Sequence, residues 1–387
     1  MEENADFLTQ QLITYIGNKR ALLPFLKQAV DIVRKDIKKE KLKCADLFSG
    51  SGIVARYLKQ FSSLLVVNDL EKYSCIINNC YLANGLGQNQ QLKKIWQELT
   101  GKIDRRMLQL EESRKKGTYE HPGFISELYA PGDLKKIKRN ERCFYTPYNA
   151  NYIDVARQLI EKEVPPELRQ FFIAPLLSQA SVHANTAGIF KGFYKNSQTK
   201  TGQFGGNGKD ALSRILGNIT IPYPVHSNFD CSFLVYNHNA NELVRLKEFK
   251  DLESFDMVYL DPPYNQHPYG SNYFMLNLIA DYQRPDEQNI SRVSGIPKAW
   301  NRSHYNKKRF AGESFFDLIE ELDARYILVS FNSEGFISKE EMIEKLSRTG
   351  KVQVLETDYN TFRGSRNLSG REIHVKEYLF LVKKQQA

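Results

Sequence analysis

The stretch Cys-Ala-Asp-Leu-Phe-Ser-Gly-Ser-Gly at residues 44–52 is a short apolar run that stops at an acid and opens into a glycine-rich turn. Apolar residues at helical spacing follow it at 53–61. A second apolar run, Leu-Leu-Val-Val-Asn-Asp at 64–69, again ends in an acid, and a second helical pattern occupies 71–84. This alternation of strands and helices predicts an α/β fold with a doubly wound, mostly parallel sheet.

The alternation stops near Asn84, where the chain becomes amphipathic and highly charged through residues 90–143. Strand-like patterns resume further along, at 231–237, 255–264, 326–332 and 376–382. We therefore predict one α/β core built from residues 1–88 and 226–387. A largely helical inserted domain at 89–225 interrupts it.

The bulk composition indicates a soluble globular protein, because 41% of the 387 residues are hydrophobic and 26% are charged. No apolar run approaches the roughly 20 residues of a membrane-spanning helix. The acidic, polar N-terminus is not a secretory signal, so a cytoplasmic location is expected. The five cysteines show no paired spacing, which indicates reduced thiols and no metal site.

The net charge of +9 fits a polyanionic partner, since each Lys or Arg placed on a phosphate releases bound counterions. Many basic proteins bind no nucleic acid, so charge alone decides little. The basic residues do cluster, however, and their clusters coincide with the loops considered below.

The glycine-rich turn has the form of a cofactor loop. A strand ends, glycines let the backbone turn tightly, and a helix begins with free N–H groups. Such a loop can lie against a nucleoside, and its candidate contacts are Asp46, Phe48, Ser49, Gly50 and Gly52. The pattern differs from G-x-G-x-x-G, which disfavours a nicotinamide cofactor. Asp69, at the end of the next strand, suits ribose hydroxyls, although an acid there could also be a simple helix cap.

The second motif closes the apolar strand pattern at 255–264 and reads Asp261, Pro262, Pro263 and Tyr264. Two prolines stiffen the backbone and remove two N–H donors, leaving the Asp261 carboxylate and the Pro262 carbonyl as acceptors. Adenine's amino lone pair is delocalised into the ring. Accepting its two N–H bonds frees that lone pair for a sulfonium methyl group, and Tyr264 can stack on the base. A proline-stiffened strand exit is the alternative, disfavoured because both motifs occur together.

Together these motifs resemble the Dam-like, alpha-class adenine-N6 DNA methyltransferases of restriction–modification systems and bacterial epigenetic control. The resemblance covers most of the chain and implies a methyltransferase core that uses S-adenosylmethionine, with an inserted DNA-recognition domain. Residues 15–19, Tyr-Ile-Gly-Asn-Lys, look like the family's aromatic–glycine–lysine element. It implies that Tyr15, Gly17 and Lys19 border the cofactor and the target base. Without the family, this segment would be an ordinary start of a helix.

One position departs from the family pattern. Where the family usually carries an acid that accepts a bond from the cofactor's adenine amino group, this chain has Asn239. An amide carbonyl oxygen can still accept such a bond. Asn239 therefore stays among the expected cofactor contacts.

Three stretches have the composition of DNA contacts. Residues 183–206 interleave amides, basic residues and aromatics among turn formers, as a hairpin in the major groove would. A flap is expected at 266–273, and residues 363–367 resemble the family's late basic hairpin. The candidate contacts are Lys191, Tyr194, Lys195, Asn196, Gln198, Lys200, Gln203, Tyr269, Asn272, Arg363 and Arg366. Each stretch alone would more often be a solvated loop, but their common position around one predicted cleft favours DNA.

We therefore predict methyl transfer from S-adenosylmethionine to the N6 amino group of adenine in a specific double-stranded DNA sequence. The base must be flipped out of the helix, because its amino group is otherwise paired and stacked. A separate restriction endonuclease is a possible partner. Two rivals remain open from the sequence: an RNA or protein-glutamine methyltransferase, which usually has Asn before Pro-Pro-Tyr, and a catalytically idle DNA-binding protein.

Overall fold

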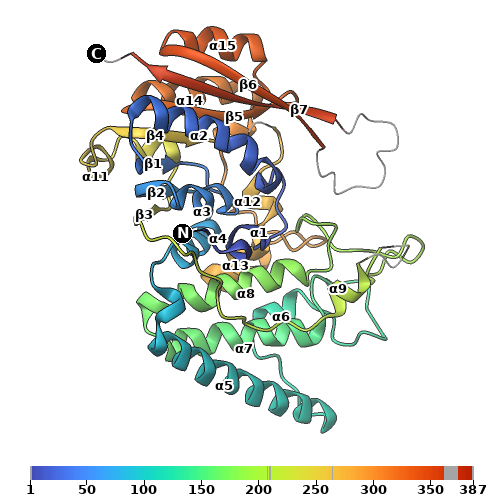
Figure 1. Cartoon of the computed structure of the whole chain (residues 1–387). Helices are drawn as coiled ribbons and strands as arrows, with labels where there is room; N and C mark the ends of the chain where they lie inside the picture. Colours follow the sequence, from blue (N-terminus) through green and yellow to red (C-terminus); the bar gives the residue numbers. More distant parts are fainter. Residues whose placement is uncertain (1, 207, 209–210, 264, 361–373, 386–387) are drawn as a thin grey trace.

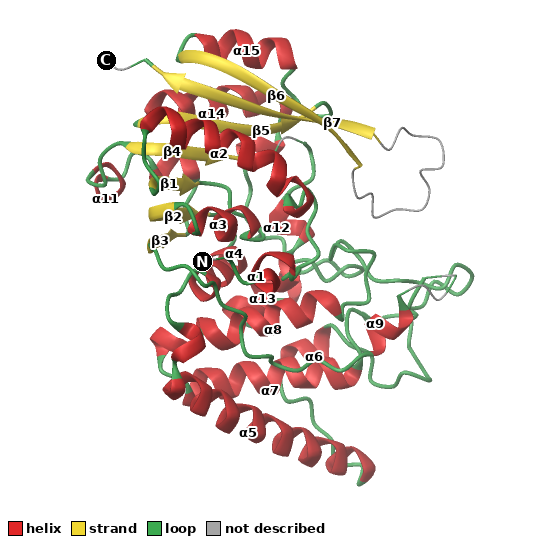
Figure 2. Cartoon of the chain, in the orientation of Figure 1, coloured by secondary structure: helices red, strands yellow, loops and turns green. Residues whose placement is uncertain are grey.

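The structure is a computed structural model that describes residues 2–206, 208, 211–263, 265–360 and 374–385 (Figure 1). A twisted sheet with flanking helices forms one part of the molecule, and a group of helices forms the other (Figure 2). The strands are β1 Leu42–Asp46, β2 Ser62–Asn68, β3 Ser232–Tyr236, β4 Phe255–Leu260, β5 Ala324–Asn332, β6 Gly350–Asn360 and β7 His374–Lys384.

The seven strands form one sheet in the order β3-β2-β1-β4-β5-β7-β6. The pairs β1–β2, β2–β3, β1–β4 and β4–β5 are parallel, whereas β7 is antiparallel to both β5 and β6. The predicted α/β fold with a mostly parallel sheet is confirmed. Strand β6 was not predicted, because its sequence mixes charged and polar residues and it pairs with the sheet on one side only.

The helices are α1 Ala5–Thr9, α2 Leu23–Ile37, α3 Ile53–Lys59, α4 Lys72–Tyr81, α5 Gln90–Lys115, α6 Phe124–Leu128, α7 Pro147–Glu163, α8 Gln170–Val182, α9 Leu212–Leu216, α10 Ala240–Leu243, α11 Lys247–Lys250, α12 Tyr269–Asn272, α13 Phe274–Asp281, α14 Lys308–Glu321 and α15 Lys339–Ser347. Helices α2 and α3 share one apolar cluster with one face of the sheet. Helices α10, α11, α14 and α15 share another with the opposite face. Strand β4 shows the alternation: Met257 and Tyr259 belong to the first cluster, Val258 and Leu260 to the second.

The helical part contains α5 to α8 and lies beside the sheet part (Figure 1). Its longest helix, α5, begins at Asn89, whose side chain accepts from the Leu92 N–H at 2.9 Å, a typical N-cap. One side of α5 is apolar, and its buried residues are Leu92, Leu99, Ile103, Met107 and Leu110. They join an apolar cluster that also includes residues of α4 and α13. Packing is therefore continuous across the sequence boundary expected near residue 88.

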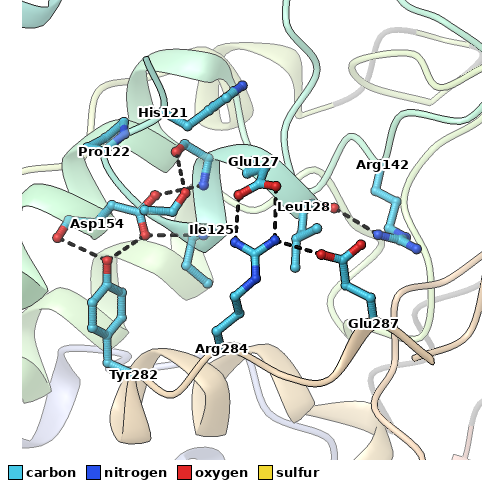
Figure 3. A network of polar contacts seen from close by, with 12 residues as sticks. His121, Pro122, Ile125, Glu127, Leu128, Arg142, Asp154, Tyr282, Arg284 and Glu287 are labelled. Atoms are coloured by element: carbon cyan, nitrogen blue, oxygen red, sulfur yellow. Dashed lines mark hydrogen bonds and ion pairs between the residues drawn. The ribbon is translucent and has the colours of Figure 1, made fainter. Parts of the chain in front are cut away.

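A polar network joins the helical part to the chain that follows α13 (Figure 3). The Arg284 guanidinium donates to both carboxylate oxygens of Glu127, at 2.6 and 2.9 Å. The Tyr282 hydroxyl donates at 2.8 Å to the fully buried Asp154 carboxylate, which also accepts from the Ser126 N–H at 2.8 Å. The exposed Arg284 pair contributes little stability, whereas the buried Asp154 needs each of its partners. This network holds α6 and α7 against the segment after α13.

All five cysteines are buried and free. Among the described residues, none of the helices combines the length and the apolar character that crossing a membrane requires.

Candidate active site

The candidate site lies at the carboxyl ends of β1, β2 and β4. Strand order reverses between β1 and β4, and open α/β sheets bind ligands at such a switch point. A cavity there encloses about 960 Å³, part of it open to solvent. It brings together most of the predicted cofactor and catalytic residues, namely Tyr15, Gly17, Lys19, Asp46, Phe48, Ser49, Gly50, Asp69, Asn239, Asp261, Pro262 and Pro263. Gly52 lies behind this lining, at the start of α3.

The glycine loop is held by backbone hydrogen bonds, one to strand β2 and one within the loop. The Ser49 N–H donates to the Asn68 carbonyl at 3.1 Å, and the Gly52 N–H donates to the Ser49 carbonyl at 2.8 Å. Gly50 has a φ of +52°, which glycine adopts without strain. A Cβ at Gly50 would lie 2.7 Å from an edge atom of the Tyr15 ring. The loop therefore offers bare backbone to the cavity and allows Tyr15 to approach closely.

Asp69 fixes the glycine loop in place by accepting hydrogen bonds. One of its carboxylate oxygens accepts from the Gly50 N–H at 2.7 Å, and the other accepts from the Glu71 N–H at 2.8 Å. The side chain is 9% exposed, and burial raises the pKa of Asp69 to about 6. The sequence left open a cofactor contact or a helix cap. Asp69 makes cap-like bonds in the structure, and a ribose contact would use the remaining lone pairs.

Asn239, like Asp69, both accepts a cap-like hydrogen bond and lines the cavity. Its side-chain oxygen accepts from the Asn241 N–H at 3.0 Å and caps α10, while the residue also lines the cavity. The oxygen has a second lone pair, so the predicted bond to a cofactor amino group would be made in addition to the cap.

Four acids and one lysine line this cavity, namely Asp46, Asp69, Glu71, Asp261 and Lys19. The Lys19 ammonium lies 3.4 Å from Oδ1 of Asp261. Burial raises the pKa of Asp261 to about 6, with Lys19 opposing the rise. Burial also raises the pKa of Asp46, and the neighbouring Asp261 carboxylate adds to that effect. Asp69 and Asp261 both have a pKa of about 6 and are mostly ionised at pH 7, so they outnumber Lys19 and the cavity favours a positively charged ligand.

Three stacked tyrosine rings form an aromatic wall on one side of the cavity. The Tyr15 ring stacks on Tyr269 and Tyr273, at centroid distances of 5.1 and 4.9 Å. The Tyr269 hydroxyl donates to the Ile16 carbonyl at 3.2 Å, and Tyr269 lines the cavity. Asn272, in the same short helix α12, is only 1% exposed. The expected flap is therefore partly helix packed inside the protein, and a DNA contact by Asn272 is not supported by its position.

The segment at 191–206 contains a small hairpin. Lys195 and Gly202 form an antiparallel bridge, and the side-chain Oδ1 of Asn196 accepts from the Gln198 and Thr199 N–H groups, both at 2.9 Å. Asn196 therefore stabilises the turn, which leaves its amide nitrogen for any base contact. Lys191, Lys195, Gln198 and Lys200 are exposed, whereas Tyr194 and Gln203 are half-buried.

Tyr264, Arg363 and Arg366 lie outside the described residues. Two acids near the site were missed by sequence reasoning. Glu71 lines the cavity and accepts from the Asn301 amide at 3.2 Å, and burial raises its pKa to about 7. Glu377, on β7, lies 3.3 Å from the Lys19 ammonium. An acid directly before the apolar run at 378–382 was the available signal.

Comparison with known proteins gives the family. The sequence pattern of the family described as D12 class N6 adenine-specific DNA methyltransferase matches residues 15–344. The chain is 30% identical over 379 residues to the type II methyltransferase M.NlaIII of Neisseria lactamica, covering 96% of this chain and 99% of that one. It is 29% identical to the type II methyltransferase M.CviAII of Paramecium bursaria Chlorella virus 1, covering 96% and 98%.

A third relative, the type II methyltransferase M.FokI of Planomicrobium okeanokoites, is 27% identical, and the alignment covers 96% of this chain but 53% of that longer one. The family match spans both the glycine loop and the Asp-Pro-Pro motif at the cavity. This protein therefore belongs to the D12 class of N6 adenine-specific DNA methyltransferases and methylates adenine in DNA.

Proposed function

We propose that the cavity holds S-adenosylmethionine together with a target adenine flipped out of duplex DNA. The observation that carries this proposal is the meeting, in one cavity, of a backbone-lined glycine loop with Asp261 and Pro262. S-adenosylmethionine supplies a methyl group activated by the positive charge of its sulfonium.

The residues present fit that cofactor. Gly50 lacks a Cβ and leaves backbone for a nucleoside to lie against, while Asp46, Asp69 and Asp261 complement a cationic ligand. The Phe48 and Tyr305 rings pack edge to face, with their centroids 5.1 Å apart, and give the same cavity an apolar side. Both the charge and the shape of the lining support S-adenosylmethionine.

Asp261 and Pro262 would orient the amine. The Asp261 carboxylate and the Pro262 carbonyl accept its two N–H bonds, which localises the nitrogen lone pair. Pro262 and Pro263 have no N–H groups to compete for that position. As the nitrogen bonds to the methyl carbon, the carbon–sulfur bond of the sulfonium would break and leave a neutral thioether. The nitrogen would then give up one proton, and the Asp261 carboxylate is the acceptor placed to take it.

Base flipping is proposed because Asp261 lies inside the cavity. Asp261 is largely enclosed at the end of a central strand, and an adenine inside a duplex cannot reach it. The wall formed by Tyr15 and Tyr269 offers an aromatic face, and Tyr264 remains the proposed stacking partner of the base. The charged, helical segment 89–225 is the proposed recognition domain. A cognate endonuclease and a cytoplasmic location complete the proposal, in line with the type II names of the relatives.

The direct test supplies S-adenosylmethionine with a labelled methyl group and duplex DNA to the purified chain. Label should appear as N6-methyladenine within one short sequence, located by sequencing the product. Label on cytosine, or DNA left unlabelled by a protein that binds both ligands, would overturn the proposal.

The pH dependence of the reaction should reflect Asp261. Its carboxylate must be ionised to accept one amine N–H and then the proton, and burial raises its pKa to about 6, whereas an ordinary aspartate titrates near 4. The rate constant kcat should therefore fall as the pH drops through about 6. Measurements at saturating S-adenosylmethionine separate this effect from the titration of Asp69. A constant kcat down to about pH 4 would contradict the assignment.

The hairpin within 191–206 should separate affinity from specificity. Lys195→Ala should weaken binding to all duplexes alike and lower the salt slope by about 1, because the side chain would hold a phosphate. Gln198→Ala should instead relax preference at one base pair, at a cost of about 1–3 kcal/mol. Lys351→Ala, exposed on the edge strand β6, is the matched control. If neither hairpin variant changes binding, the charged stretch 93–142 becomes the next candidate.

A further inference from the structure

A buried lysine bridges two carboxylates behind the Asp-Pro-Pro motif. The Lys19 ammonium lies 3.4 Å from Oδ1 of Asp261 and 3.3 Å from Oε2 of Glu377. Lys19 is 3% exposed and Glu377 is 2% exposed. The two residues are 358 positions apart in the chain and meet only because β7 runs inside the sheet, between β5 and β6 (Figure 1).

Stability alone does not explain Glu377. One lysine already neutralises Asp261, so a second buried carboxylate leaves the three groups with a net negative charge and adds a desolvation cost. Glu377 does not line the cavity itself, whereas Lys19 and Asp261 both do. Its contact with the site therefore passes through Lys19, while its charge also acts on Asp261 directly.

The positions of the three groups indicate how Glu377 affects Asp261. An ammonium has three N–H donors in a movable group, and a single carboxylate partner would not hold it in one place. Glu377 accepts one of these bonds and holds the ammonium on Oδ1 of Asp261. The Glu377 carboxylate also partly neutralises the Lys19 ammonium. Without it, the full positive charge of Lys19 would make Asp261 a weaker hydrogen-bond acceptor.

We propose that Glu377 is a positioning residue for methyl transfer: through Lys19 it directs Asp261, leaving Oδ2 of that carboxylate as the acceptor for the target amine. This inference rests on the proposed role of Asp261. The charged groups around Asp261 are Lys19 before α2, Glu377 on β7 and Asp46 on β1, and Asp69, directly after β2, acts on Asp46.

The test uses Glu377→Gln, which keeps an oxygen for the Lys19 bond but removes the charge. We expect folding and binding of both ligands to persist, with kcat lowered roughly tenfold or more. Because the Glu377 charge raises the pKa of Asp261, its loss should also move the acidic limb of the kcat profile to lower pH. A purely structural role would leave that limb in place.

Two further variants complete the design. Glu377→Asp keeps the charge on a shorter side chain, so the acidic limb of the kcat profile should stay at its wild-type pH while kcat falls. This variant also tests the inference if Glu377→Gln does not fold. Glu356→Gln, on the neighbouring strand β6, removes a surface ion pair with Lys339 and should change neither readout. A wild-type pH profile in folded Glu377→Gln overturns the inference. Near-normal turnover by folded Asp261→Ala would instead overturn the role of Asp261 in the proposed function, so the two failures are distinguishable.

Discussion

Replacing Asp261 by alanine should lower the rate of adenine methylation at least roughly a hundredfold while the protein stays folded. The reason is the loss of the acceptor that localises the amine lone pair, an interaction made mainly in the transition state and worth about 3 kcal/mol or more. Single-turnover methylation of duplex DNA at saturating S-adenosylmethionine measures the effect. Affinity for both ligands should change far less than the rate.

Asp256→Ala provides the matched control. Asp256 lies near the start of β4, the strand that Asp261 follows. It is buried and accepts from the Lys39 ammonium and the Lys43 N–H, both at 2.9 Å. Its removal should lower the free energy of unfolding without changing the rate of the folded enzyme. Near-normal turnover by folded Asp261→Ala, or an equal loss in Asp256→Ala, would contradict the proposed mechanism.

Replacing Gly50 by alanine should weaken binding of S-adenosylmethionine about tenfold or more. The φ of +52° costs an L-residue about 1–2 kcal/mol. The added Cβ would also lie 2.7 Å from the Tyr15 ring, which packs against Tyr269 and Tyr273 and is not free to move away. The loop or the aromatic wall must shift, and either change disturbs the cavity. Equilibrium titration of the cofactor measures the loss.

Gly85→Ala separates backbone strain from the clash. Gly85 has a φ of +67°, close to that of Gly50, but a Cβ there would meet no atom within 4 Å. This variant should lose a similar amount of stability and keep its cofactor affinity. If both variants bind the cofactor equally well, the glycine loop is not the cofactor site.

The strands beside the site were predictable because each is a short apolar run that ends in a polar motif. The patterns at 44–48 and 255–264 correspond to β1 and β4, which carry the glycine loop and Asp261. Strand β6 was not predictable in this way, since its alternating polar residues resemble those of a solvated segment. Antiparallel pairing with β7 is what makes it a strand.

The sequence by itself determined the α/β fold, the two motifs and the adenine chemistry, because these depend on local patterns that persist in any context. Only the tertiary structure decided what individual side chains do. Asp69 is engaged by the Gly50 and Glu71 N–H groups, Asn272 is buried, and Glu377 reaches Lys19 from the other end of the chain. These outcomes depend on which strands become neighbours, and that choice is made by packing over the whole sheet rather than by residues near in sequence.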